Sequence, residues 1–124
     1  MSENKIYKIE LKKKNISRSD IIKYQLITFC FFNNISLTKL DIEFLVQLAL
    51  KKVVELNKFC EEIGGENKIF SSSQSARNAI NKAGIKKLIM KKGKNKKLIF
   101  INPELNLQVS GNILLDYKLL CYDS

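Results

Sequence analysis

Polar side chains recur on one face of a predicted helix in the second half of the chain. Gln74, Asn78 and Asn81 are spaced four and three residues apart, and Arg77 and Lys82 flank them. Because a helix turns by about 100° per residue, this spacing gathers the side chains on a single face. Amide groups and a guanidinium can hydrogen-bond to the edges of bases. The face is therefore a candidate for binding nucleic acid.

Lysines dominate the segment that follows. Between residues 86 and 97 there are seven lysines and no acidic residue. They are Lys86, Lys87, Lys91, Lys92, Lys94, Lys96 and Lys97. Neutralised phosphates release counterions, so such a cluster binds a phosphate backbone with an affinity that falls as salt rises. Two alternatives stay open: the lysines bind an acidic protein surface, or they only keep an exposed hairpin soluble and protect its edge from aggregation.

The residues around the polar face predict where its helix begins and ends. Ser71 and Gln74 fit a capping box, which predicts a helix start at Ser71. Gly84 occupies the place of a left-handed C-terminal cap, with Ile85 as its apolar contact, so the helix is expected to end at Ala83. Opposite the polar face runs a stripe of mostly small apolar residues, which would pack closely on a core. This stripe consists of Ala76, Ala79, Ile80 and Ala83.

Two short strand-like runs, residues 87–91 and 97–102, follow this helix. Gly93 and Asn95 in the segment between them suit a tight turn. We therefore expect a basic antiparallel hairpin over about residues 86–102. A helix followed by such a hairpin is the outline of a winged helix.

The length and the charge of the chain limit its organisation. Its 124 residues suit one domain, with roughly two thirds of the unfolded surface buried on folding. We predict an α+β fold with a single winged-helix domain over residues 17–103 and strand-forming arms at 1–16 and 104–124. The net charge of +10 indicates a polyanionic partner. Arg18 and Arg77 are the only arginines, so contacts with nucleic acid should favour phosphates over base sequence.

The chain offers little material for catalysis or for metal binding. It has no histidine, no Cys-x-x-Cys pair, no glycine-rich phosphate loop and no Gly-x-Ser-x-Gly. We therefore expect no enzyme activity, no metal and no cofactor. Cys30, Cys60 and Cys121 are odd in number, far apart and set among apolar residues. This usage indicates buried, reduced thiols in a cytosolic protein.

The start of the chain and its apolar runs carry no pattern typical of targeting. Residues 1–14 contain no apolar segment of the kind found in a secretory signal. The longest apolar run, residues 26–32, is too short to span a bilayer. We expect a soluble protein, either intracellular or packaged in a particle that is assembled inside a cell.

A helix is predicted early in the chain. Ser17 and Asp20 suit a helix start. The segment from about Asp20 to Phe32 is apolar nearly all round, so it is expected to be central to the core.

Another predicted helix starts at a capping box formed by Thr38 and Asp41. Helical spacing of apolar residues then continues to Ile63, where Gly64 stops it. The helix is either unbroken or jointed near residues 51–52. An unbroken helix would serve contacts with a partner. A jointed one would make residues 53–63 and 71–83 the two helices of a helix-turn-helix.

Both ends of the chain carry strand patterns. Tyr7, Ile9 and Leu11 alternate with charged residues, which is the period of a half-buried strand. Residues 112–122 also alternate and are apolar on both faces. This second strand is expected either to pair with the first one in the same chain or to add to the sheet of a neighbouring copy.

The order of helix, basic hairpin and the sequence Ile101, Asn102, Pro103 resembles the winged helices of plasmid and phage replication initiators. It is similar, more loosely, to MarR-like regulators. The extended ending from Ile101 to Leu120, in a chain rich in Lys, Asn and Ile, also resembles small winged-helix proteins of crAss-like phages. This last resemblance implies a phage protein of the virion neck.

Two functional hypotheses follow. In the first, the protein is a non-enzymatic adaptor of the virion neck or head-tail ring, assembled with other virion proteins in the bacterial host cytoplasm. Its terminal strands would join neighbouring copies into an oligomer, and its basic hairpin would face DNA or an acidic partner. In the second, it is a cytoplasmic DNA-binding regulator or replication initiator. That protein would place the polar face of the helix in the major groove and the hairpin lysines on phosphates. Neither hypothesis involves a membrane.

Overall fold

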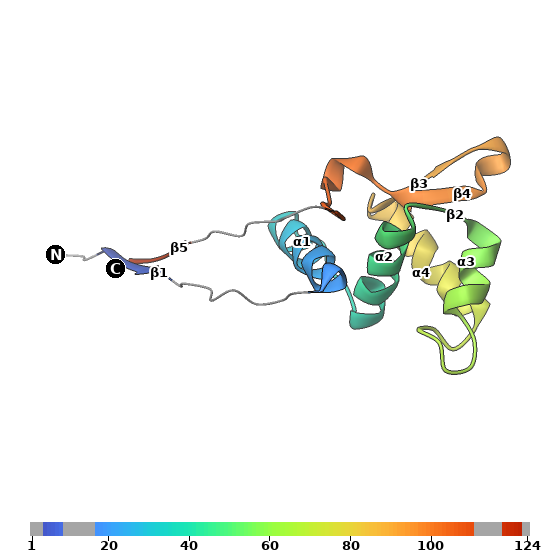
Figure 1. Cartoon of the computed structure of the whole chain (residues 1–124), viewed down its shortest axis with the longest axis horizontal. Helices are drawn as coiled ribbons and strands as arrows, with labels where there is room; N and C mark the ends of the chain where they lie inside the picture. The colour runs from blue at the N-terminus through green and yellow to red at the C-terminus, as the bar shows by residue number, and fades with distance from the viewer. Residues whose placement is uncertain (1–3, 9–16, 111–117, 123–124) are drawn as a thin grey trace.

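The computed structural model describes residues 4–8, 17–110 and 118–122 of the chain. Four helices and a small sheet make up the segment 17–110 (Figure 1). The helices are α1 (Arg18–Phe32), α2 (Lys39–Lys51), α3 (Leu56–Ile63) and α4 (Ser73–Ile85). The strands of the sheet are β2 (Val53–Glu55), β3 (Ile89–Lys92) and β4 (Leu98–Ile101), and the short 3-10 turns η1 (Lys94–Lys96) and η2 (Pro103–Leu105) follow the last two strands. The predicted α+β class is confirmed.

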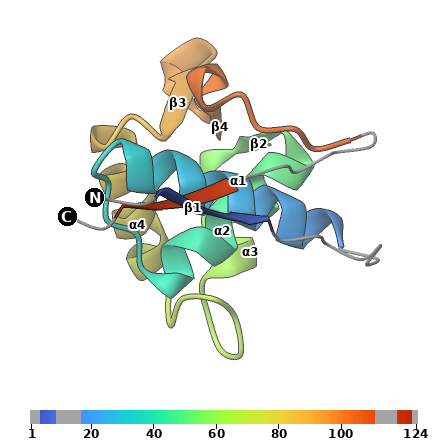
Figure 2. The same cartoon turned by 90° about the vertical axis from the view of Figure 1, so that its left-hand side faces the viewer.

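The three strands form an antiparallel sheet in the order β2, β4, β3. Ile99 in the central strand β4 lies opposite Val54 of β2 on one side and Lys91 of β3 on the other. Both Figure 1 and Figure 2 show the sheet along one side of the helices. The succession from α2 to β4, with the first strand of the sheet beside the last one, is compatible with a winged-helix-like fold.

The long predicted helix is broken after Lys51, so the jointed alternative is confirmed and the unbroken one is wrong. Lys52 adopts φ 73° and ends α2, and β2 follows at once. Glu55 then begins α3, because its carboxylate accepts hydrogen bonds from the backbone N–H groups of Asn57 and Lys58 at 3.2 and 3.0 Å. Apolar spacing continues through the joint because Val54 of β2 packs against the core.

The predicted ends of α4 are wrong by one residue at its start and two at its end. Ser72, not Ser71, caps the helix by accepting the N–H of Ser75 at 3.1 Å. At the other end, Gly84 is helical and Lys87 takes the left-handed conformation, with φ 63°. The N–H groups of Lys87 and Leu88 donate to the carbonyls of Gly84 and Ala83, which is a Schellman cap. Buried Leu88, rather than Ile85, is the apolar residue of this cap.

Helix α1 buries one side only. Ile22, Leu26 and Cys30 recur every four residues and belong to the core, where α1 packs on α2. The opposite side carries Phe31 and Phe32, which are 76% and 75% exposed. The expectation that this helix is central to the core is therefore wrong. A single buried stripe is enough to pack α1 on α2 at the edge of the helical layer (Figure 1).

The chain continues to pack on the core beyond Pro103. Leu105 is buried, and Leu107 and Val109 lie against the core. The side chain of Gln25 in α1 holds this segment, because its Nε2 donates to the carbonyl of Gln108 at 2.9 Å and its Oε1 accepts the N–H of Gln108 at 2.7 Å. A side-chain amide thus pairs with the backbone in the way that a neighbouring strand would.

The strands at the two ends are β1 (Asn4–Lys8) and β5 (Lys118–Tyr122). They pair antiparallel within one chain, with Tyr7 opposite Leu119. The remainder of the predicted terminal strands, residues 9–11 and 112–117, lies outside the described residues. Within the described part of the chain, none of the helices has the length and apolar character needed to cross a membrane.

Candidate nucleic-acid interface

Helix α4 divides its surface into a buried stripe and a free polar face. Ala76, Ala79, Ile80 and Ala83 are all buried, so the predicted packing stripe is confirmed. The side chains on the opposite face are Gln74, Asn78, Asn81 and Lys82, and all four are exposed. The small stripe residues let α4 sit close against the rest of the core, which fixes the direction in which its polar face points.

Two of the amides on this face are joined to each other. Nε2 of Gln74 donates a hydrogen bond to Oδ1 of Asn78 at 3.0 Å, one helical turn along. This contact restricts the rotamer of Asn78 and leaves its Nδ2 group free to donate outward. A polar group that is held in place loses less conformational entropy when it binds a ligand.

The exposed face of α4 that carries the amides also contains an apolar residue, Ile85. Ile85 lies four residues after Asn81 and seven after Asn78, which places it on the same helix face, and it is 81% exposed. The expectation that Ile85 forms the apolar contact of a helix cap is wrong, because the helix continues through Gly84. Its spacing from the asparagines is the sequence signal that could have placed it on this face.

Arg77 does not lie with the other polar side chains. It is half-buried, and its guanidinium donates to Oδ1 of Asn57 in α3 at 2.5 Å. This hydrogen bond connects α3 to α4. Arg77 was predicted as one of the binding residues, whereas its position is that of a residue that joins α3 to α4.

The wing, which we define as residues 89–101 with the adjoining Lys87, forms the second part of the interface. The predicted hairpin is present, with strands Ile89–Lys92 and Leu98–Ile101. Gly93, Asn95 and Lys96 all have positive φ in the turn, which confirms that Gly93 and Asn95 are turn residues. Six lysines on or beside this hairpin are exposed: Lys87, Lys91, Lys92, Lys94, Lys96 and Lys97.

Two lysines of the predicted cluster have partners in the protein. Nζ of Lys92 lies 5.1 Å from the centroid of the Phe100 ring, which keeps this side chain along the wing while its charge remains exposed. Lys86 is turned away, because its Nζ donates to the carbonyl of Ser36 at 2.7 Å. Lys86 therefore helps to hold the loop between α1 and α2, apart from the wing lysines.

Glu55 is an acidic residue next to the wing, because it belongs to β2, which pairs with β4. Its pKa is lowered, first by the hydrogen bond from the N–H of Lys58, then by the N–H of Asn57 and by the charges of Lys58 and Lys97. Glu55 therefore remains a carboxylate, and it lies opposite Leu98, next to the turn of the wing. The tip itself, Lys94 to Lys96, contains no acid.

The cysteine thiols that the structure describes lie in the core. Cys30 and Cys60 are free and buried, as predicted, and burial raises the pKa of each thiol. The side chain of Cys121 lies outside the described residues. Among the side chains that the structure describes, no three His, Cys, Asp or Glu residues gather in a way that could hold a metal ion.

The comparisons with known proteins give no relative for this chain: no family model matches it, and neither the curated proteins nor the solved structures contain a match.

Proposed function

We propose that this protein binds double-stranded DNA without catalysing a reaction on it, with α4 in the major groove and the wing on the phosphate backbone. The observation that carries the proposal is the exposed polar face of α4 next to a wing with six exposed lysines. The order of helices and strands that brings them together is compatible with a winged-helix-like fold. In helix-turn-helix proteins the second helix of the motif lies in the major groove.

The charges favour phosphate contacts over base contacts for most of the binding energy. Lysine ammonium groups act as point charges and bind phosphate without requiring a particular base. Three of them, Lys94, Lys96 and Lys97, lie at or next to the turn of the wing, where a groove-bound helix would leave them near a backbone. Binding should therefore weaken steeply as salt rises.

Fluorescence anisotropy with a labelled duplex at several salt concentrations tests this proposal. The double variant Lys94→Gln, Lys96→Gln should bind more weakly and should reduce the slope of log K against log salt by about 2, one for each phosphate that is no longer neutralised. The matched control is Lys23→Gln, Lys39→Gln, which removes the same charge from α1 and α2. Absence of duplex binding at low salt, or an equal weakening in the control, would contradict the proposal.

The virion adaptor is a second candidate, and the exposed aromatic side of α1 favours it. Phe31 and Phe32 form an edge-to-face pair with 5.4 Å between ring centroids, on the outside of the helix. Exposed apolar side chains that adjoin one another mark surfaces that contact other proteins. The hypothesis that the terminal strands join neighbouring copies loses support, because β1 and β5 pair within one chain.

Sedimentation separates the two candidates. An adaptor that forms a homo-oligomeric ring should associate as its concentration rises, and Phe31→Ser with Phe32→Ser should abolish this association without changing DNA binding. A wild-type protein that remains monomeric at high concentration would count against the ring.

A further inference from the structure

The exposed face of α4 contains groups suited to adenine and thymine. Asn78 and Asn81 present side-chain amides, and an asparagine amide can form two hydrogen bonds with the N6 and N7 positions of adenine in the major groove. The hydrogen bond from Gln74 holds Asn78 and uses one of the two lone pairs of its Oδ1 atom. Nδ2 and the second lone pair remain, and these are the donor and the acceptor that adenine requires.

Ile85 adds an apolar group at the end of this face. It is the most exposed of the large hydrophobic side chains in the described part of the chain. A single exposed apolar residue is ordinary. Ile85, however, lies in line with Asn78 and Asn81, over two helical turns that together span about 10 Å. Thymine is the base that offers a methyl group in the major groove, and aliphatic side chains contact it favourably.

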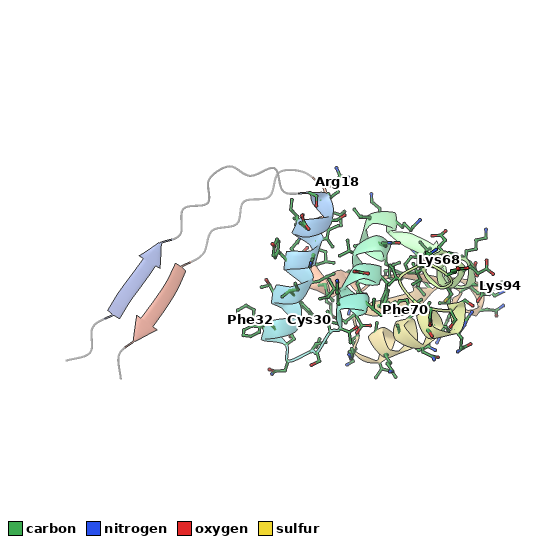
Figure 3. The ribbon with its side chains drawn as sticks, turned by 90° about the horizontal axis from the view of Figure 1, so that it is seen from below. Arg18, Cys30, Phe32, Lys68, Phe70 and Lys94 are labelled. Carbon is green, nitrogen blue, oxygen red and sulfur yellow. The ribbon has the colours of Figure 1, made fainter. Side chains whose placement is uncertain are left out.

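The group best suited to guanine is removed from this face. Guanine offers two acceptors that a guanidinium binds in a bidentate manner, and this is the commonest specific contact with DNA. Arg77 is half-buried and bound to Asn57 of α3. Arg18 stands at the start of α1, on the far side of the helical layer from Lys94 of the wing (Figure 3). Lys82 remains on the flank of the face, where its ammonium can bind a phosphate.

We infer that α4 recognises A·T base pairs, through the amides of Asn78 and Asn81 and the side chain of Ile85, so that the preferred ligand is AT-rich duplex DNA. This inference rests on the proposed function, because it requires α4 to lie in the major groove. Beyond the proposed function, the inference states that the protein also recognises the methyl group of thymine.

Three duplexes of equal length, compared at one salt concentration, test the inference. The first contains A·T pairs, the second has uracil in place of every thymine, and the third has inosine·cytosine pairs. Uracil removes only the methyl group. Inosine·cytosine resembles G·C in the major groove and A·T in the minor groove, because inosine lacks the 2-amino group of guanine. The wild-type protein should bind the A·T duplex most tightly, and the uracil duplex about fourfold less tightly for each thymine methyl group that Ile85 touches.

Variants assign the preference to side chains. Ile85→Ala should bind the thymine and uracil duplexes equally well, because no aliphatic group is left to distinguish them. Asn78→Ala should reduce the preference for A·T over inosine·cytosine about tenfold. Ile27→Ala is the matched control, because Ile27 is also an exposed isoleucine, 40% exposed, but lies on α1. It should leave both preferences unchanged.

Each other outcome has a separate meaning. Equal binding of the three duplexes would overturn the inference and leave the proposed function standing. Inosine·cytosine bound as well as A·T would also overturn it, because α4 would then not distinguish A·T from a pair with the major-groove groups of G·C. No binding of any duplex would overturn the proposed function itself.

Discussion

The side-chain amide of Asn102, at the end of β4, donates a hydrogen bond to the carbonyl oxygen of Lys87 at 2.8 Å. Asn102 is only 8% exposed, and its backbone N–H donates to the carbonyl of Leu88 at 2.9 Å. Its Oδ1 atom accepts the N–H of Glu104 at 3.1 Å. One residue thus joins the base of the wing to the turn that ends α4. The relative orientation of the two parts of the proposed interface depends on it.

Replacement of Asn102 should loosen this junction. We expect Asn102→Ala to lower the free energy of unfolding by about 1 to 2 kcal/mol, because Lys87 and Glu104 are each left without a hydrogen-bond partner in a partly buried place. Urea denaturation measures the change. Asn81→Ala is the control, since Asn81 is exposed on α4 and alanine favours a helix. If Asn102→Ala is destabilised no more than this control, the junction contributes little.

The left-handed conformation of Lys87 leads to a second prediction. A side chain at φ 63° costs about 1 kcal/mol relative to glycine, and glycine is the usual residue at this place in a Schellman cap. Lys87→Gly should therefore raise the free energy of unfolding by about 0.5 to 1 kcal/mol, after allowance for the greater freedom of glycine in the unfolded chain. Lys87→Ala removes the same charge but keeps a side chain in the left-handed conformation, so it should not be stabilising. If both variants change stability in the same direction, the strain at Lys87 is not the cause.

Gly64, beside the start of α4, and Gly84, inside α4, should respond in opposite ways to alanine. A Cβ atom on Gly64 would overlap the carbonyl oxygen of Ser72, so Gly64→Ala must displace the start of α4, at a cost of about 3 kcal/mol. A Cβ atom on Gly84 would have no neighbour within 4 Å, and Gly84 is helical. Gly84→Ala should therefore stabilise the protein by about 1 kcal/mol. Thermal unfolding followed by circular dichroism compares the stabilities of the two variants. A Gly64→Ala protein as stable as the wild type would contradict the close approach of Gly64 to Ser72.

Features that depend on local residues were predicted well from the sequence. The stripe from Ala76 to Ala83 is buried, because small apolar residues at helical spacing favour one packing arrangement. The capping box at Thr38 and Asp41 is present with both of its hydrogen bonds at 3.1 Å. Both groups of this motif lie within one turn, so no distant residue is needed to complete it.

Features that depend on tertiary contacts were not predictable. Lys52 and Lys87 adopt conformations that sequence rules assign to glycine, so the sequence does not decide the joint after α2 and predicts the end of α4 too early. Helical spacing places Arg77 beside the binding face, and it cannot show that its partner is Asn57, 20 residues away in the chain. Nothing in the spacing of the sequence marks that hydrogen bond, and it decides which side chains of α4 remain free.

The carboxylate of Glu55 predicts how stability changes with pH. Because the N–H groups of Lys58 and Asn57 bind the ionised form, the pKa of Glu55 is lower in the folded protein than in the unfolded chain. The contribution of Glu55 to the free energy of unfolding is therefore fully present above its pKa in the unfolded chain, about 4.3. This contribution is lost as the pH falls through its pKa in the folded protein. Stability should decrease with acidification below about pH 5, and Glu55→Gln should show a weaker decrease.

Urea denaturation of both proteins between pH 3 and pH 7 provides the measurement. Glu66→Gln, in the loop between α3 and α4, removes an equal charge and starts no helix, so its pH dependence should match that of the wild type. At neutral pH, urea denaturation of Glu55→Gln and Glu66→Gln also tests the joint between β2 and α3, because only Glu55→Gln should weaken the start of α3. Identical pH profiles for wild type and Glu55→Gln would mean that this carboxylate does not hold the start of α3.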